Sequence, residues 1–306
     1  MPGLPVEFLD ATELRALLPP AEAVAAIEDA LRGGLDPGAD PARGRVLLRT
    51  GEFLIMPADF GDYAGVKVAT VAPGNPALGR PRIQGLYVLF DAETLTPRAL
   101  LDGPALTAVR TPAVSVAAVR PALGGAPRVV VYGGGPQALG HVETLRAVAA
   151  VDEVCHVVRH PGNYRELAAS ARVLAYGEAE ALAATAAADV VVCATGARDP
   201  LFDSSILRAD AIVIAIGSHD PGQREVDAAL CRRARVVVED VATALREAGD
   251  IVLAVAEGAL VAGDLVPLRA AVSDPRGYGR DRPLLFKGTG MSWQDLVIAV
   301  AAVSGR

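Results

Sequence analysis

The sequence predicts an α/β protein with a doubly wound parallel sheet, preceded by a smaller α+β region. The β-branched run 129–131 gives way to a glycine-rich turn and then to a helical pattern over 137–150. Further strand-like runs follow it, with helical patterns between them, at 153–159, 189–195, 210–217 and 235–240. Strands that alternate with helices after a glycine turn are typical of a parallel sheet covered on both faces.

The glycine turn matches the fingerprint of a dinucleotide-binding unit. Gly133, Gly135 and Ala138 stand at its first, third and sixth positions, the last of which tolerates alanine. Gly133 permits the tight turn, and Gly135 lets a pyrophosphate approach the backbone without meeting a Cβ atom. The N-terminus of the following helix would direct free N–H groups at that pyrophosphate. These features predict a Rossmann-type domain.

The composition fits two folded domains and argues against several kinds of partner. The 306 residues are 52% apolar, and the formal charge of −7 is made of both signs scattered along the chain. We therefore expect no basic face for nucleic acid or an anionic membrane. No secretory signal is recognisable at 1–10, and the alanine-rich run 179–194 is too short and too charged to span a bilayer. We expect a cytoplasmic protein.

The cysteines and histidines predict no metal site. Cys155, Cys193 and Cys231 each lie in or beside a predicted strand or helix. They form no Cys-x-x-Cys motif, and no histidine stands at ligand spacing except His156, which adjoins Cys155. We expect buried, reduced thiols.

The first 120 residues carry a different order of elements. Apolar residues at helical spacing cover 8–17 and 20–31, and a loop rich in glycine, proline and aspartate follows over 33–44. Strand-like runs without helical patterns between them then occupy 45–48, 52–57, 65–71 and 83–91. This order predicts an antiparallel or mixed sheet. A helix over 106–120 and a linker over 121–127 lead into the glycine turn.

The chain ends with helical and loop patterns. The segment 241–271 is helical with glycine breaks, and 273–282 is a polar loop. Phe286-Lys287-Gly288-Thr289-Gly290 then precedes an amphipathic helix from about Trp293.

Two cations in the N-terminal part are candidates for binding an anion. Lys67 interrupts a strand that is otherwise apolar on both faces, where an ammonium is costly unless it is paired. If it points inward, it can hold a carboxylate or, with a lowered pKa, donate a proton; otherwise it is a surface lysine on an edge strand. Arg110 lies near the start of a predicted helix, and the forked guanidinium group of arginine suits a carboxylate or a phosphate oxygen. The alternative is an exposed helix arginine without a binding role.

Two positions after predicted strands are candidates for the second domain. Ser218-His219-Asp220 follows the strand 210–217, at the sheet edge where doubly wound folds bind ligands. Three neighbours in sequence cannot form a hydrolase triad, so His219 is instead a candidate proton donor at neutral pH. Arg159 stands where an NAD-specific site places an acid, and it suits a ribose 2′-phosphate. NADP(H) is therefore favoured over NAD(H).

Several motifs occur between about Pro41 and the C-terminus in one order. They are Met56-Pro57-Ala58, Gly65-Val66-Lys67, Gln84-Gly85, Phe90 to Thr94, Asp102-Gly103, Thr107 to Thr111, Gly133 to Ala138 with His141, and Phe286-Lys287 before Gly290. This set resembles the ornithine cyclodeaminases and mu-crystallin-like ketimine reductases, together with archaeal-type alanine dehydrogenases.

The resemblance implies a homodimer. Each chain would have three parts: a substrate-binding and dimerisation domain at 1–121, a dinucleotide-binding domain at 122–286, and a segment at 287–306 that returns to the first domain. It implies that Lys67 contacts the substrate carboxylate, assisted by Arg43 or Arg45, and that Arg110 lies between cofactor and substrate. The cofactor-binding residues that it implies are Gly133, Gly135, Pro136, Gln137, Arg159, Thr195, Ala215, Ile216, Gly217 and Thr289.

The chain also departs from this resemblance. Ornithine cyclodeaminases would carry their acid–base aspartate where His219 stands, whereas here the aspartate is Asp220, and Arg82 replaces an expected threonine and adds a cation near cofactor or substrate. We therefore predict an NADP(H)-preferring oxidoreductase that acts on the C–N bond of an α-imino or α-amino acid, with Lys67 or His219 as the proton donor. The alternatives are a cyclodeaminase that uses bound NAD and Asp220, a non-catalytic protein that binds NADPH and a small effector, and a dehydrogenase that joins two amino acids through a secondary amine.

Overall fold

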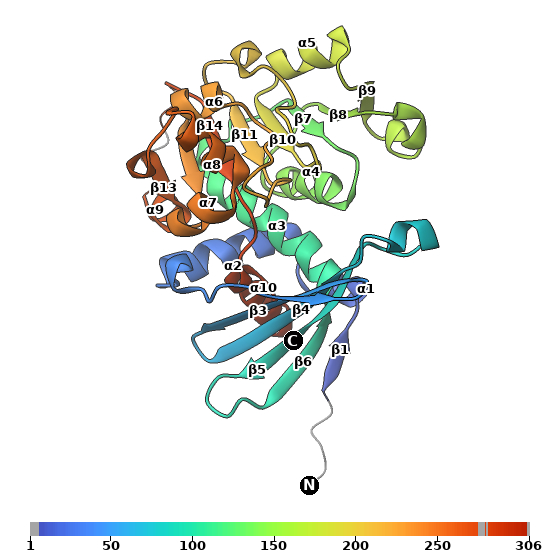
Figure 1. Ribbon diagram of the computed structural model, residues 1–306, viewed down its shortest axis with the longest axis vertical. Helices are drawn as coiled ribbons and strands as arrows, with labels where there is room; N and C mark the ends of the chain where they lie inside the picture. The colour runs from blue at the N-terminus through green and yellow to red at the C-terminus, as the bar shows by residue number, and fades with distance from the viewer. Residues whose placement is uncertain (1–5, 275–278, 280, 305–306) are drawn as a thin grey trace. The chain divides into compact units, whose positions relative to one another are not determined.

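The computed structural model describes residues 6–274, 279 and 281–304. The chain divides into two compact units (Figure 1). Unit 1 comprises Met1–Val114 and Gly290–Arg306, and unit 2 comprises Ser115–Thr289. The functional roles expected for the three predicted domains stay predictions.

The described residues of unit 1 form a six-stranded sheet in the order β1-β6-β5-β4-β3-β2. All neighbours are antiparallel except β1 and β6, which run parallel. The strands are β1 (Glu7–Leu9), β2 (Gly44–Leu48), β3 (Gly51–Phe60), β4 (Tyr63–Val71), β5 (Ile83–Asp91) and β6 (Pro97–Asp102). The helices are α1 (Ala11–Leu17), α2 (Pro20–Arg32), the first part of α3 (Gly103–Val119) and α10 (Ser292–Ser304).

Alternation along β4 decides which side chains of this sheet are buried. Gly65, Lys67 and Ala69 point to one face and are buried, whereas Val66 and Val68 point to the other face and are half-exposed. Helix α10 packs across β3, β4 and β5, and Figure 1 shows it against this sheet. Lys67 is therefore an internal residue of a central strand, and the alternative of a surface lysine on an edge strand is wrong.

The described residues of unit 2 form an eight-stranded sheet in the order β13-β12-β14-β11-β10-β7-β8-β9. Every neighbouring pair is parallel. The strands are β7 (Val129–Tyr132), β8 (Val154–Val158), β9 (Arg172–Ala175), β10 (Val190–Cys193), β11 (Ile212–Ala215), β12 (Arg235–Val238), β13 (Leu265–Pro267) and β14 (Leu284–Lys287). The helices after α3 are α4 (Pro136–Val148), α5 (Ala179–Ala187), α6 (Ala228–Arg233), α7 (Val241–Glu247), α8 (Gly249–Ala256) and α9 (Leu268–Ser273).

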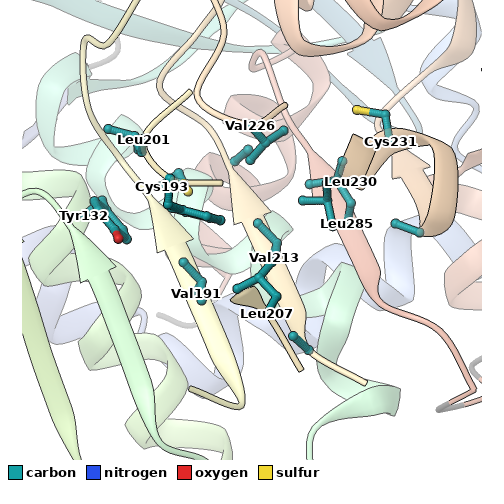
Figure 2. Close-up of a cluster of buried hydrophobic side chains, with 14 of the residues drawn as sticks. Tyr132, Val191, Cys193, Leu201, Leu207, Val213, Val226, Leu230, Cys231 and Leu285 are labelled. Carbon is teal, nitrogen blue, oxygen red and sulfur yellow. The ribbon is translucent and has the colours of Figure 1, made fainter. Parts of the chain in front are cut away.

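The core of unit 2 explains why the sheet is doubly wound. Tyr132 of β7, Val191 of β10 and Leu285 of β14 belong to one buried cluster, which also contains Leu230 of α6 and Cys231 (Figure 2). Alternate residues of these strands point to the opposite face of the sheet, and α4 packs against β7 and β10. Because helices cover both faces, the strands are apolar runs without alternation, as the sequence predicted. The predicted fold class is confirmed.

Several element boundaries differ from the prediction. Residues 7–9 form strand β1 rather than the start of a helix, and the predicted helical segment 241–271 contains strand β13. Strands β6, β9 and β14 were not predicted as strands. They are four to six residues long, and β6 and β14 carry charged residues that mask the apolar pattern. Part of the loop predicted over 273–282 lies outside the described residues.

Two further expectations concern helices and thiols. Helix α3 begins at Gly103, three residues before the predicted start. All three cysteines are free and buried, as predicted. Among the helices of residues 6–274 and 281–304, none combines the length and the apolar character that a membrane span requires.

Candidate functional site

The turn between β7 and α4 has the backbone that the dinucleotide fingerprint requires. Gly133 has a φ of +121°, and a Cβ atom there would stand 2.7 Å from the carbonyl oxygen of Ala194. Only glycine fits, both for its conformation and for its closeness to β10. His156 of β8 donates through Nδ1 to the carbonyl oxygen of Gly133 at 2.9 Å and so fixes the turn.

Gly135 has a different reason to be glycine. Its φ of −86° is open to any residue, and apart from Gly135 and its two neighbours in the chain no atom of the described residues lies within 4 Å of the position of a Cβ atom. Neither the backbone nor the packing of the protein requires glycine here. Gly135 is also the N-cap of the 13-residue helix α4, and no side chain caps that helix. The open cradle and the uncapped helix end fit a bound pyrophosphate.

A cavity of about 540 Å³ opens at this turn. Its lining comes from the carboxyl ends of β7, β8 and β10, from the segments that follow them, and from Tyr176 directly after β9. Strand order reverses at this point, because β8 and β9 lie on one side of β7 and β10 on the other. Open α/β sheets bind their ligands at such a switch point. The residues present therefore fit a nicotinamide dinucleotide.

The cavity wall includes residues that the sequence predicted and residues that it did not. Arg159, a predicted cofactor-binding residue, lines the cavity and is exposed, beside His160. Arg198 and Tyr164 line it as well, and neither was predicted. The ring of Tyr164 lies 2.4 Å from where a Cβ atom of Gly134 would stand, so the aromatic ring covers the glycine turn. An aromatic residue within a few positions of the second strand is the only sequence signal for Tyr164.

The other residues expected to bind the cofactor lie on this edge of unit 2, except Arg110, which belongs to unit 1. Pro136 and Gln137 begin α4, and the backbone carbonyl of Gln137 accepts a hydrogen bond from Nδ1 of His141 at 2.7 Å. Thr195 follows β10 and lines the cavity. Three more follow the ends of β11 and β14: Ile216, Gly217 and Thr289, with Ala215 as the last residue of β11.

A buried cluster of charges lies under helix α10 in unit 1. Nζ of Lys67 donates to Oδ2 of Asp295 at 2.6 Å, and Nε of Arg110 lies 3.7 Å from Oδ1 of the same carboxylate. Asp295 is fully buried, Lys67 is 5% exposed and Arg110 is 7% exposed. Arg110 also donates to Oε1 of Gln294 at 2.7 Å, and Lys67 donates to Oγ1 of Thr107 at 3.3 Å.

Burial decides the protonation behaviour of this cluster. Desolvation lowers the pKa of Lys67 to about 8, although the carboxylate of Asp295 raises it, and the charges of Arg110 and Arg43 lower it further. Lys67 can therefore be protonated at neutral pH and still release its proton near that pH. This combination suits a group that binds an anion and donates a proton.

The two arginines expected to assist Lys67 have different surroundings in the structure. Arg43 is half-buried and donates to the carbonyl oxygen of Gly290 at 2.8 Å. Its positive charge helps to lower the pKa of Lys67. Arg45 is exposed and pairs with Glu52 of the neighbouring strand β3. Of these two residues, Arg43 is the one whose charge acts on the buried cluster, and Arg45 is held by Glu52 at the surface.

Three other predicted residues lie on the surface of the structure. Arg82 is exposed just before β5, and His219 and Asp220 are exposed after β11. The carboxylate of Asp220 accepts hydrogen bonds from its own turn, at 2.9 Å from the amide of Gly222 and 3.4 Å from the side chain of Gln223. Both side chains of the His219-Asp220 pair are thus exposed, and the carboxylate of Asp220 is held within its own turn.

Sequence reasoning missed the carboxylates that organise both units. Asp295 was not singled out, although an acidic residue on the apolar helix that ends the chain is a signal of the same kind as Lys67. Glu225 and Asp250 of unit 2 are also buried, at 0% and 1% exposure. Tyr87 is fully buried, and within the described residues its hydroxyl has no hydrogen-bond partner. Burial and the nearby carboxylates of Asp295 and Asp40 raise the pKa of Tyr87 well above its ordinary value.

Comparison with known proteins gives consistent relatives. The chain is 35% identical over 250 residues to Delta(1)-pyrroline-2-carboxylate reductase 2 of Burkholderia ambifaria, which covers 80% of this chain and 78% of the relative. The solved structure of Thermococcus litoralis Delta(1)-pyrroline-2-carboxylate reductase, in complex with NADH and L-proline, matches with a TM-score of 0.86 and 25% identity, over 98% of this chain and 97% of that one. An archaeal alanine dehydrogenase dimer with bound NAD matches with a TM-score of 0.86 and 26% identity, over 98% and 95%.

The sequence pattern of one family covers nearly the whole described chain. It matches residues 8–303, a range that contains the buried cluster of unit 1 and the glycine turn of unit 2. The resemblance inferred from the motifs is thereby confirmed. The chain belongs to the ornithine cyclodeaminase/mu-crystallin family.

Proposed function

We propose that the protein is an NAD(P)H-dependent reductase of the C=N bond of a cyclic α-imino acid of the Δ1-pyrroline-2-carboxylate kind. The buried cluster of Lys67, Asp295 and Arg110 carries this proposal, because an α-imino acid offers a carboxylate beside a nitrogen that must gain a proton. The named activities of the pyrroline-2-carboxylate reductases support the same substrate class.

The chain's own residues account for binding and for proton transfer. The ammonium of Lys67, helped by the nearby guanidinium of Arg43, would hold the substrate carboxylate. A bound nicotinamide dinucleotide supplies the hydride that the imine carbon gains. The imine nitrogen gains a proton, and the product is a secondary amine. Lys67 is the better donor of the two candidates, because it is buried and has a pKa of about 8, whereas His219 is exposed.

Two of the three alternatives predict other outcomes than reduction of an imino acid. A cyclodeaminase would need Asp220 as its acid–base group, but the hydrogen bonds of this exposed carboxylate stay within its own turn. A binding protein without activity would retain the nucleotide and turn over nothing. Both are distinguished from a reductase by the first assay.

The first assay follows the loss of reduced-nicotinamide absorbance with purified protein. NADPH and, separately, NADH are mixed with Δ1-pyrroline-2-carboxylate, with its six-membered homologue and with a linear imino acid. We expect oxidation with the cyclic imino acids and formation of the cyclic amino acid. Nucleotide binding without oxidation of any imino acid would contradict the proposal, and ammonia release from L-ornithine would establish the cyclodeaminase instead.

We further propose that NADP(H) is the preferred cofactor, with Arg159 as the residue that recognises the ribose 2′-phosphate. Arg159 lines the cavity directly after β8, and His160 and Arg198 stand around the same space. The variant Arg159→Ala is expected to raise the Kd of NADPH by roughly tenfold, the size of one lost charge-assisted hydrogen bond, and to leave that of NADH nearly unchanged.

The matched control for this variant is Arg165→Ala. Arg165 is an exposed arginine of the same segment that is absent from the described cavity lining. Fluorescence titration of both variants with both dinucleotides gives the comparison. Equal weakening of NADPH and NADH by Arg159→Ala, or wild-type preference for NADH, would count against the assignment.

We also propose that the protein is a homodimer that forms through the sheet of unit 1. The face opposite Lys67 is apolar and open: Phe8, Val46, Ile55 and Leu86 are 36% to 48% exposed and come from four strands. An apolar sheet face of this extent is typical of an interface. A similar solved protein, the archaeal alanine dehydrogenase, is a dimer.

Light scattering after size exclusion tests the dimer. We expect a mass of twice the chain's 31.5 kDa for the wild type and for Leu182→Glu, which changes an exposed residue of α5 in unit 2. The double variant Ile55→Glu/Leu86→Glu is expected to be monomeric, because two carboxylates would be desolvated on each side of the interface. A monomeric wild type, or a dimer that tolerates both glutamates, would refute this interface.

A further inference from the structure

A buried carboxylate joins the segments that follow two neighbouring strands of unit 2. Oε1 of Glu225 accepts hydrogen bonds from the amide of Thr195 at 2.8 Å and from its hydroxyl at 2.7 Å. Oε2 of Glu225 accepts from the amide of Gly217 at 2.7 Å. Thr195 lies two residues beyond β10 and Gly217 two residues beyond β11. One side chain therefore ties together the carboxyl ends of both strands.

A second carboxylate holds Glu225 in place. Oδ1 of Asp250 accepts from the amides of Glu225 at 2.7 Å and of Val226 at 2.9 Å. Nζ of Lys287, the last residue of β14, lies 3.0 Å from Oδ2 of Asp250 and donates to the carbonyl oxygen of Ser218 at 2.6 Å. The network thus reaches the end of a third strand, and all three charged side chains are buried.

The packing around this network leaves no room for a Cβ atom at two glycines. A Cβ atom on Gly217 would stand 2.0 Å from the carbonyl oxygen of Thr195 and 2.5 Å from Oε1 of Glu225. A Cβ atom on Gly249 would stand 1.9 Å from the carbonyl oxygen of Gln223. The three hydrogen bonds described for the carboxylate of Glu225 come from donor groups of Thr195 and Gly217, an arrangement that suits an ionised carboxylate.

Stability alone is a poor reason for such a network. Three buried charges lose their hydration, and apolar residues of similar volume often give an equally stable core. What an apolar core cannot do is fix two backbone amides at set positions. These amides belong to the sheet edge where open α/β folds bind ligands, and Thr195 lines the cavity of the glycine turn.

We propose that Glu225 is a positioning residue for the nicotinamide dinucleotide, which fixes the segments after β10 and β11 in the conformation that the cofactor binds. This inference rests on the proposed function, because that function supplies the cofactor. It assigns Glu225 no contact with the substrate or with the reacting atoms. Asp250 and Lys287 act one step further away, through the backbone of Glu225 and the carbonyl of Ser218.

The test compares Glu225→Gln with Asp227→Asn in the full-length protein. Glu225→Gln keeps the shape but places an NH₂ group against donors, so one of the two segments loses its acceptor. Asp227 is the matched control, because its carboxylate also accepts three hydrogen bonds, from the amide and hydroxyl of Ser204 at 2.8 and 2.6 Å and from the amide of Leu230 at 2.8 Å. It caps helix α6 and touches neither Thr195 nor Gly217 in the described contacts.

Two readouts are used, and neither needs turnover. Titration with NADPH is expected to show a Kd at least tenfold higher for Glu225→Gln than for the wild type, and a Kd within about twofold for Asp227→Asn. Amide hydrogen exchange of the cofactor-free protein is expected to become faster at Thr195 or Gly217 in Glu225→Gln only. Thermal unfolding of both variants shows whether they lose similar stability.

The outcomes separate this inference from the proposed function. An unchanged Kd for Glu225→Gln, or equal weakening by both variants, would overturn the positioning role, and so would unchanged exchange at both amides. A wild-type protein that binds NADPH but reduces no imino acid would refute the proposed reaction and leave the positioning role standing on its own measurements. A wild type that binds neither NADPH nor NADH would overturn both.

Discussion

The variant Lys67→Met is expected to lower kcat/KM for the imino acid by roughly a thousandfold. The loss of a charge-assisted hydrogen bond to the substrate carboxylate costs about 1.5–3 kcal/mol, and the loss of a positioned proton donor costs roughly 10²–10⁴-fold in rate. Methionine retains most of the volume, so the face of β4 under α10 stays filled. Steady-state kinetics with NADPH and Δ1-pyrroline-2-carboxylate measures the effect.

The variant Lys67→Arg separates the two roles of this side chain. Arginine keeps the positive charge beside Asp295, but it does not release a proton at any working pH. We expect KM for the imino acid to change by only a few-fold and kcat to fall by about 10². The Kd of NADPH should stay near the wild-type value in both variants, since Lys67 is not among the residues predicted to bind the cofactor. A kcat/KM for Lys67→Met within twofold of the wild type would remove Lys67 from the reaction.

The sequence alone predicts those features that depend on neighbouring residues in the chain. The glycine turn at Gly133 and Gly135 is local, because the strand, the turn and the helix are consecutive and each residue type has its own steric reason. Lys67 is also recognisable, since an ammonium in an apolar strand is costly anywhere except beside a partner. Strand order is not local. β14 enters the sheet between β11 and β12, and no pattern within its four residues indicates that place.

The partners of these residues are the part that sequence reasoning could not reach. Asp295 pairs with Lys67 across 228 positions of the chain, and Glu225 binds Thr195 across 30. Each acid has no motif around it, and only folding brings it to its partner. The choice between Arg43 and Arg45 is similar. The two arginines are two residues apart and look alike in sequence. Only Arg43 donates a hydrogen bond to the backbone carbonyl of Gly290, two residues before α10.

The pairing of Lys67 with Asp295 leads to the second large effect, which is on the pH dependence of the reaction. Lys67 must be protonated to hold a carboxylate, so kcat/KM of the wild type is expected to fall as the pH rises through the Lys67 pKa of about 8. The carboxylate of Asp295 raises that pKa, whereas Arg110 and Arg43 lower it. Asp295→Asn removes the raising contribution and leaves the lowering ones. The fall of kcat/KM on the alkaline side of its pH profile, called here the alkaline limb, should therefore move to lower pH by roughly one unit or more in this variant.

The control for Asp295→Asn is Gln294→Leu on the same buried turn of α10. This variant removes the hydrogen bond to Arg110 at 2.7 Å but changes no charge beside Lys67, so its alkaline limb should stay where the wild type has it. Both variants are expected to lose stability, and Asp295→Asn more, because it leaves two buried cations without their shared anion at a cost of about 3–5 kcal/mol. The pH profile of kcat/KM, measured for the wild type, Asp295→Asn and Gln294→Leu, tests this prediction. If the limb of Asp295→Asn coincides with that of the wild type, or moves to higher pH, then Lys67 is not the group whose protonation the reaction requires.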